Sequence, residues 1–197
     1  MQEGSAPTSF AKNIKEAVIV FLDGISFKPH REVSILTQLG EISDEQSFVL
    51  VVGKKPISLD AVPQGKRYMF VGITNLIYEA GHYPFATSLA VVDAETAKIV
   101  VDDILVCAED GDATVMSPDI FADIVDGKML RIVSPKEESL QNAKAIWYCP
   151  MAGKELPEVN KTFGEICELA NEECDAFSTA SSLNGREKDY LIVIDEI

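Results

Sequence analysis

The hydrophobic positions of the first two-thirds of the chain fall into short, β-branched runs separated by turn residues. Continuous apolar runs at 16–22, 47–52 and 67–78 are typical of buried strands, and each is bounded by glycine, proline or acidic residues. A shorter alternation of apolar and polar residues at 32–36 predicts a further strand. This part of the chain is therefore expected to be rich in β-structure.

The region that follows is predicted to contain a β-hairpin. Residues 87–92 and 98–101 are both apolar and β-branched, and they flank a loop of about five residues at 93–97. Residues 104–107 extend the second strand in this interpretation. A hairpin of this kind favours an antiparallel sheet, because strands joined by a short loop run in opposite directions.

Helical signals concentrate after residue 116. The Ser-Pro pairs at 117–118 and 134–135 are typical of helix N-termini, where serine caps the helix and proline takes its first position. The strongest helical periodicity runs from about 157 to 177, with apolar residues every three or four positions. Strands are predicted at 129–133, 145–149 and 190–194.

These elements predict an α+β fold: a mainly antiparallel β-sheet with two or three helices concentrated in the C-terminal third. The segregation of strands and helices argues against a doubly wound α/β fold. Residues 1–12 are predicted to form a flexible N-terminal arm, and 13–197 a single α+β domain with a possible subdomain change near 116. The apolar strand at 190–194 is expected to return to the sheet formed by the earlier strands.

Charge narrows the classes of partner. The chain has 32 acidic residues against 17 lysines and arginines, for a net charge of -15. Such a charge repels nucleic-acid backbones and anionic membranes, and it attracts basic proteins or cations. The alternative is that the negative charge serves only to keep the protein in solution. The apolar runs are too short for a signal peptide or a membrane helix, so a cytoplasmic protein is expected.

The cysteines offer a candidate nucleophile. Among the four cysteines no CxxC pair exists, which argues against a zinc ribbon or a thioredoxin-type site. Cys149 stands at a predicted strand end, and His82 lies in a predicted loop. A cysteine nucleophile needs a nearby histidine or another source of a lowered pKa. The alternative is that Cys149 is a buried structural thiol.

An acidic stretch offers a candidate cation site. Hard cations such as Ca²⁺ and Mg²⁺ take carboxylate ligands, and the candidate ligands are Asp103, Glu109, Asp110 and Asp112. Their spacing does not match an EF-hand loop, and a solvated turn explains the same composition. No cofactor is expected.

One small basic cluster is a candidate for anion binding. It is Lys-Pro-His-Arg at 28–31, which either binds an anion or pairs with internal carboxylates. Glycine-rich phosphate loops are absent: Gly53-Lys54-Lys55 follows a predicted strand, but it lacks the upstream glycine and the following serine or threonine of a P-loop.

The sequence favours a non-enzymatic acidic binding or assembly protein that engages a basic protein partner or forms a homo-oligomer. This interpretation rests on the charge and on the missing catalytic motifs. The alternative is a cysteine-dependent hydrolase or transferase that uses Cys149 with His82. Neither nucleic acid nor a membrane is an expected partner.

Overall fold

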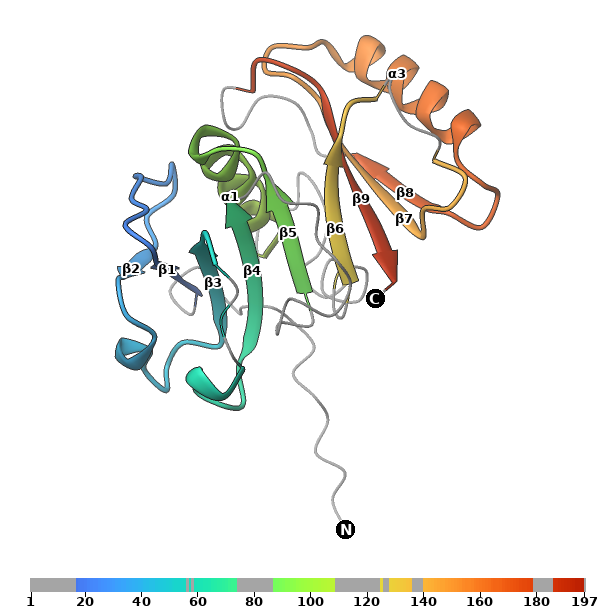
Figure 1. The fold of residues 1–197 in the computed structure, drawn as a ribbon. Helices are drawn as coiled ribbons and strands as arrows, with labels where there is room; N and C mark the ends of the chain where they lie inside the picture. Colours follow the sequence, from blue (N-terminus) through green and yellow to red (C-terminus); the bar gives the residue numbers. More distant parts are fainter. Residues whose placement is uncertain are drawn as a thin grey trace.

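A computed structural model describes residues 17–55, 57, 59–73, 87–108, 125, 128–135, 140–178 and 186–196 of the chain (Figure 1). Its elements, in chain order, are β1 (Ala17–Phe21), β2 (Ser34–Leu36), η2 (Leu39–Glu41), β3 (Phe48–Gly53), η3 (Leu59–Ala61), β4 (Arg67–Ile73), β5 (Thr87–Val91), α1 (Ala94–Ala108), β6 (Lys128–Val133), β7 (Ala145–Cys149), α3 (Leu156–Leu169), β8 (Asp175–Ser178) and β9 (Tyr190–Glu196).

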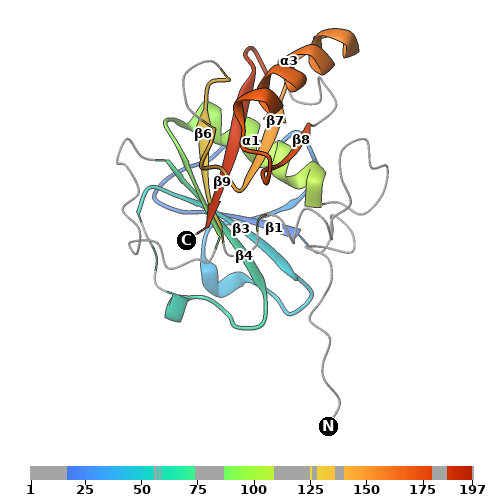
Figure 2. The ribbon, with the colours of Figure 1, turned by 90° about the vertical axis from the view of Figure 1, so that its right-hand side faces the viewer.

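The strands form a mixed sheet in the order β2-β1-β3-β4-β5-β6-β9-β7-β8. Neighbouring strands from β2 to β6 pair in parallel, and so do β7 and β8. β9 is antiparallel to both of its neighbours, β6 and β7, so all the other strands point the same way. The sheet twists along its length, so that its two ends are turned against each other (Figure 2).

The inner strands are continuous apolar runs because both faces of the sheet are covered. Every residue of β1 and of β3 is buried. Parallel strands covered on both faces show this unbroken hydrophobic pattern, whereas a half-exposed antiparallel strand alternates. The apolar runs at 16–22 and 47–52 therefore reflect parallel pairing.

The helix α1 covers one face of the sheet. Asp93 caps its N-terminus: the Asp93 Oδ1 atom accepts a hydrogen bond of 2.7 Å from the amide of Thr96. The buried apolar side chains of α1 follow helical spacing and pack against β1, β3, β4 and β5. They are Ala97, Val100, Val101, Ile104, Leu105 and Cys107.

The predicted hairpin at 87–101 is therefore wrong. Residues 87–91 do form a strand, but 94–108 form a single helix that crosses over the sheet. The β-branched residues of this segment suggested strands, although their spacing also fits a helix. Burial of the helical stripe against the sheet outweighs the weak strand propensity of valine and isoleucine.

The helix α3 lies on the opposite face, over the C-terminal strands (Figure 1). Its buried residues Val159 and Ile166 pack against the side chains of β7 and β9 on the face that α3 covers, including Ile146 and Val193. Residues at alternate positions of these strands, such as Trp147, belong instead to the core beneath α1. Helices thus cover both faces.

The predicted fold class is wrong in its main features. The sheet is mostly parallel, with one antiparallel strand among those described, and a long helix lies in the middle of the chain. The architecture is α/β. The error has a physical origin: parallel strands need crossover connections, and the one at α1 was interpreted as a hairpin.

The remaining predicted strands and helices are partly confirmed. The strand predicted at 190–194 forms β9, and it returns to the sheet beside β6 as expected. The helix predicted at 157–177 is shorter, because 175–178 form β8. The helix predicted to begin at the Ser-Pro pair at 117–118 and the arm at 1–12 lie outside the described residues, although Val125 is described and is helical. In the described part of the chain, neither helix has the length and apolar character needed to cross a membrane.

Candidate functional site

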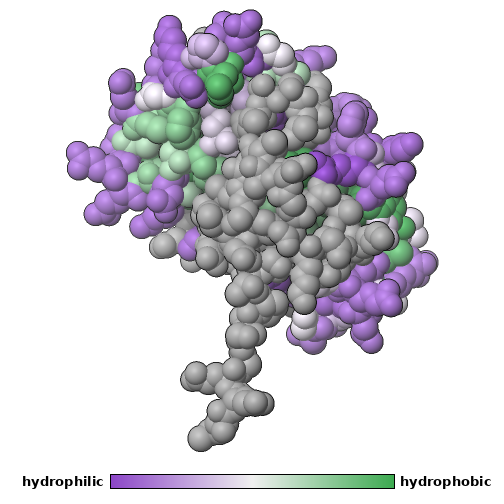
Figure 3. Space-filling model, turned by 180° about the vertical axis from the view of Figure 1, so that it is seen from behind, coloured by the Kyte–Doolittle hydropathy of each residue, from purple (hydrophilic) through white to green (hydrophobic). Residues whose placement is uncertain are grey.

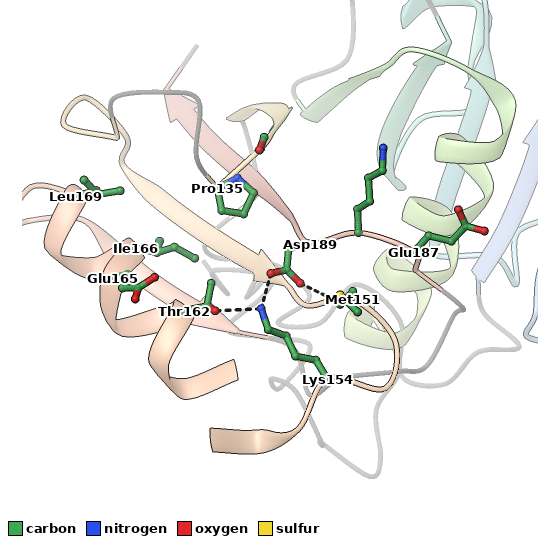
Figure 4. A pocket seen from close by; sticks show the side chains of 11 residues that line it. Pro135, Met151, Lys154, Thr162, Glu165, Ile166, Leu169, Glu187 and Asp189 are labelled. Carbon is green, nitrogen blue, oxygen red and sulfur yellow. Dashed lines mark hydrogen bonds and ion pairs between the residues drawn. The ribbon is translucent and has the colours of Figure 1, made fainter. Parts of the chain in front are cut away.

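A groove of about 690 Å³ opens at the carboxyl edge of the sheet (Figure 4). Three segments meet there: the end of β6, the end of β7 and the beginning of the antiparallel strand β9. The helix α3 forms the remaining wall. The lining residues are Ser134, Pro135, Met151, Lys154, Thr162, Glu165, Ile166, Leu169, Glu187, Lys188 and Asp189.

Lys154 occupies the centre of a polar network at one end of this groove. Its Nζ atom donates to Asp189 Oδ2 at 2.5 Å, to Tyr148 at 3.0 Å and to Thr162 at 3.0 Å. The Tyr148 hydroxyl donates to Asp189 at 3.1 Å, and the amide of Met151 donates to the second carboxylate oxygen at 2.8 Å. The network joins β7, α3 and the segment before β9 into one unit.

The network shifts both charged groups towards their ionised forms. Burial alone would raise the pKa of Asp189, but the hydrogen bonds from Lys154 and from the Met151 amide outweigh it. The pKa of Asp189 therefore lies below its ordinary value of 3.8. Burial alone would lower the pKa of Lys154, but its bonds to Asp189 and Tyr148 raise the pKa above 10.5. A lysine held protonated in this way is an anchor and a poor nucleophile.

These shifts predict a pH window for the stabilising effect of the Lys154–Asp189 pair. The contribution of Asp189 is complete above its unfolded pKa and is lost as pH falls through the lower folded pKa. The contribution of Lys154 is complete below its unfolded pKa and is lost as pH rises through the higher folded pKa. We expect Lys154→Met to lower the free energy of unfolding by about 1–3 kcal/mol between about pH 4 and pH 10, and by less outside that window.

Urea denaturation of wild type and Lys154→Met at pH 7 and pH 2.5 tests this window. Lys161→Met is the matched control, because Lys161 lies 3.9 Å from Glu165 in an exposed pair and is expected to contribute little. An equal loss of stability at both pH values would contradict the assigned role of the pair.

The end of the groove away from Met151 is apolar, and the helix α3 beside it has an acidic surface. Leu169, at this end, is 49% exposed, which is high for a large apolar side chain. Residues 155–175, which include α3, carry seven acidic side chains and one lysine, and all eight are exposed. From behind, hydrophilic side chains surround a smaller hydrophobic patch on the half that contains α3, β7 and β8 (Figure 3).

A buried ion pair links the segment before β9 to α1. Arg186 and Asp103 are 2% and 3% exposed, and their side chains meet at 2.6 Å. The Arg186 Nε atom donates to the carbonyl of Pro150 at 2.7 Å, and the Tyr190 hydroxyl donates to the other oxygen of Asp103. Since Arg186 precedes the groove residue Glu187 directly, this pair fixes one wall of the groove to α1.

The comparisons with known proteins identify no family. No family model matches the sequence, and no curated protein matches it. Among solved structures, an empty FtsZ dimer from M. jannaschii is similar, with a TM-score of 0.41 and 10% identity; 76% of this chain and 63% of the FtsZ chain are covered. This chain therefore spans less than two thirds of that FtsZ chain.

The candidate nucleophile Cys149 lies in the core. It is completely buried at the end of β7, and burial, with the charge of Asp103, raises the pKa of its thiol well above 9.0. A nucleophilic cysteine needs the opposite shift and access to substrate. His82 lies outside the described residues, so its pairing with Cys149 remains an untested prediction.

The candidate cation ligands are placed only in part. Asp103 points into the protein and binds Arg186 and Tyr190. Glu109, Asp110 and Asp112 lie outside the described residues. Within the described ranges, no group of three histidine, cysteine or acidic side chains is arranged to hold a metal ion.

Sequence reasoning missed the residues that build the groove. Lys154 and Asp189 are 35 positions apart, and Asp103 and Arg186 are 83 positions apart. No local pattern marks pairs at such separations. One signal was available: Asp189 directly precedes the buried strand at 190–194, and Arg186 lies four residues before that strand. Polar residues at strand ends often line sites in α/β proteins.

Proposed function

We propose that this chain is a non-enzymatic binding protein whose groove receives a segment of a basic protein partner. The observation that carries the proposal is the combination of the exposed apolar side chain of Leu169 at the groove with the exposed acidic side chains of residues 155–175 beside it. Binding sites for peptide segments commonly combine an apolar anchor point with charged residues that set orientation.

The apolar part of the groove suits one hydrophobic side chain of the partner. Leu169 and Ile166 come from α3, and Pro135 follows the end of β6 (Figure 4). Ile166 is buried, whereas Leu169 keeps about half of its surface exposed. Covering the exposed part of Leu169 with an apolar side chain is favourable, because it removes apolar surface from water.

The acidic side chains beside the groove determine which kind of partner is favoured. Glu165 lines the groove from α3, and Glu187 lines it, beside Lys188, from the segment before β9. Glu168 lies on the exposed surface of α3. These carboxylates attract lysine and arginine side chains and accelerate the encounter with a basic partner. A second copy of this chain would bring an identical acidic face to the same place, and like charges would oppose its docking.

A peptide-display selection against the purified chain tests this proposal. We expect the selected peptides to place lysine or arginine next to a large apolar residue and to bind less tightly as salt rises. In the variant Glu165→Lys/Glu187→Lys the dissociation constant of such a peptide is expected to rise by about tenfold or more. Isothermal titration calorimetry measures the change.

The matched control is Asp44→Lys/Glu45→Lys, which reverses two exposed acids between η2 and β3. It changes the net charge equally but lies outside the groove lining, so it is expected to weaken binding only slightly. Selected peptides without basic residues, or equal effects of the two variants, would contradict the proposal. So would a homodimer in light scattering that Glu165→Lys/Glu187→Lys dissociates.

A further inference from the structure

The carboxyl ends of β1 and β3 form a topological switch point. Along the chain β1 is followed by β2, which lies on one side of β1 in the sheet. On the other side of β1 lies β3, and the strand that follows β3, β4, lies farther out on that side. The connections that leave β1 and β3 therefore run towards opposite edges of the sheet. In open parallel sheets, ligands bind in the crevice outside the strand ends at such a point. The two ends are level, because Phe21 pairs with Val52.

Two turns meet at this point and are joined by Asp23. The chain reverses after β1 in a turn closed by a 3.0 Å hydrogen bond from the Ile25 amide to the Leu22 carbonyl. Asp23 and Gly24 in this turn have positive φ angles, of 56° and 74°. A left-handed conformation is unfavourable for a residue with a side chain, so Asp23 is held there by its contacts.

The contacts of Asp23 are to the turn after β3. Its Oδ2 atom accepts hydrogen bonds from the amides of Lys54 at 2.7 Å and Lys55 at 3.1 Å. A Cβ atom on Gly53 would lie 3.3 Å from the same oxygen and 3.3 Å from the ring of Phe70. Glycine at this position thus lets the carboxylate approach, and the carboxylate fixes the backbone that carries the two lysines.

Because Asp23 binds backbone amides, the lysine side chains keep their charge for other partners. Lys54 and Lys55 are exposed, and among the described residues no carboxylate pairs with either ammonium group. Lys28 adds a third positive charge at this edge: it follows Phe27, whose ring packs edge-on against Phe21, the last residue of β1, at 4.6 Å.

The loop that carries Lys28 is also held in place. The amide of His30 donates to Asp102 Oδ1 of α1 at 2.7 Å, so the segment after β1 is tied to the helix that covers this face. Lys54 and Lys55 thus stand on the turn after β3, and Lys28 stands on the loop after β1, in a protein whose net charge is -15. The Asp23 carboxylate at this point is bound by two backbone amides, so the three exposed ammonium groups are left to attract a small anion.

We propose that the switch point between β1 and β3 binds the phosphate group of a small molecule, with Lys28, Lys54 and Lys55 as its cationic contacts. Ammonium groups act as point charges towards phosphate oxygens. A small ligand is favoured because the net charge of the chain would repel an extended polyanion such as a nucleic acid. This site is separate from the groove beside α3, so either proposal can fail without the other.

Titration of the ¹⁵N-labelled chain with inorganic phosphate and, in a second arm, methyl phosphate tests the site at constant ionic strength. We expect saturable shifts of the amide signals of Gly24, Gly53, Lys54 and Lys55 in two-dimensional NMR spectra. Tighter binding of methyl phosphate identifies a phosphate ester as the ligand, and tighter binding of the free ion identifies inorganic phosphate.

Two double variants complete the test. Lys54→Met/Lys55→Met is expected to weaken binding about tenfold, whereas Lys54→Arg/Lys55→Arg, which keeps the charges, retains most of it. Lys144→Met/Lys161→Met removes two exposed lysines elsewhere and is expected to leave binding unchanged. The proposal is overturned by shifts that do not saturate, or by equal effects of Lys54→Met/Lys55→Met and Lys144→Met/Lys161→Met.

Discussion

Replacing Asp103 with asparagine is expected to lower the free energy of unfolding by about 3–5 kcal/mol. The side chain is 3% exposed and balances the charge of Arg186, which is 2% exposed. Removing the carboxylate charge leaves a buried guanidinium without its counter-ion. The Nη2 atom of Arg186 already has no hydrogen-bond partner among the described residues, so the remaining contacts compensate poorly. Urea denaturation at pH 7 measures the loss.

The adjacent residue supplies a matched control. Asp102 is also buried on α1, but burial raises its pKa, and its contact is with the His30 amide rather than a cation. An asparagine side chain at this position would keep an oxygen for that amide, so Asp102→Asn is expected to change stability by less than about 1 kcal/mol. Equal losses in Asp102→Asn and Asp103→Asn would show that the ion pair has no special role.

A double replacement distinguishes the effect of losing both charges of the Asp103–Arg186 pair from the effect of losing one. Replacing both Asp103 and Arg186 with leucine or methionine removes both charges at once. Such replacements of buried pairs are often close to neutral, whereas removal of one partner is costly. We expect Asp103→Leu/Arg186→Met to recover part of the stability that Asp103→Asn loses. Recovery stays incomplete, because Pro150 and Tyr190 lose a hydrogen-bond partner.

The second large effect concerns the helix that sequence patterns predicted as a hairpin. Ile104→Ala is expected to destabilise the protein by about 2–5 kcal/mol. The side chain of Ile104 on α1 is fully buried against the sheet, so its truncation leaves a cavity. In a protein of this length, that loss lowers the melting temperature by roughly 4–20 °C. Differential scanning calorimetry measures the change.

Val92→Ala is the control for this second effect. Val92 lies just before α1, is β-branched like its neighbours, and is 66% exposed. Its truncation is expected to change the stability by no more than about 0.5 kcal/mol. A small effect at Ile104 together with a large effect at Val92 would contradict the helical assignment of 94–108.

The positions of most inner strands were readable from the sequence. The runs at 16–22 and 47–52 became β1 and β3, and the runs at 145–149 and 190–194 became β7 and β9. Unbroken apolar stretches of this length mark segments that are buried on both faces. The direction in which β1 and β3 pair was predicted wrongly. Pairing direction depends on the connections between strands, and the connection at 94–108 was assigned to the wrong element.

The groove was not readable in the same way. Lys154, Asp189 and Tyr148 meet because β9 inserts between β6 and β7, an arrangement that no local pattern encodes. The Lys-Pro-His-Arg cluster at 28–31 and the Gly-Lys-Lys segment at 53–55 were each visible as isolated motifs. Their shared position at one switch point follows from the strand order alone.

Local hydrophobic patterning thus specified which segments of the chain are buried, and the composition specified its net charge. The classes of partner inferred from that charge stay predictions. Strand order, strand direction and the pairing of distant charges were set in the folded chain. The physical reason is that burial of an apolar run is nearly independent of its neighbours. An ion pair such as Asp103–Arg186 forms only when α1 and the segment before β9 are brought together by packing the whole sheet.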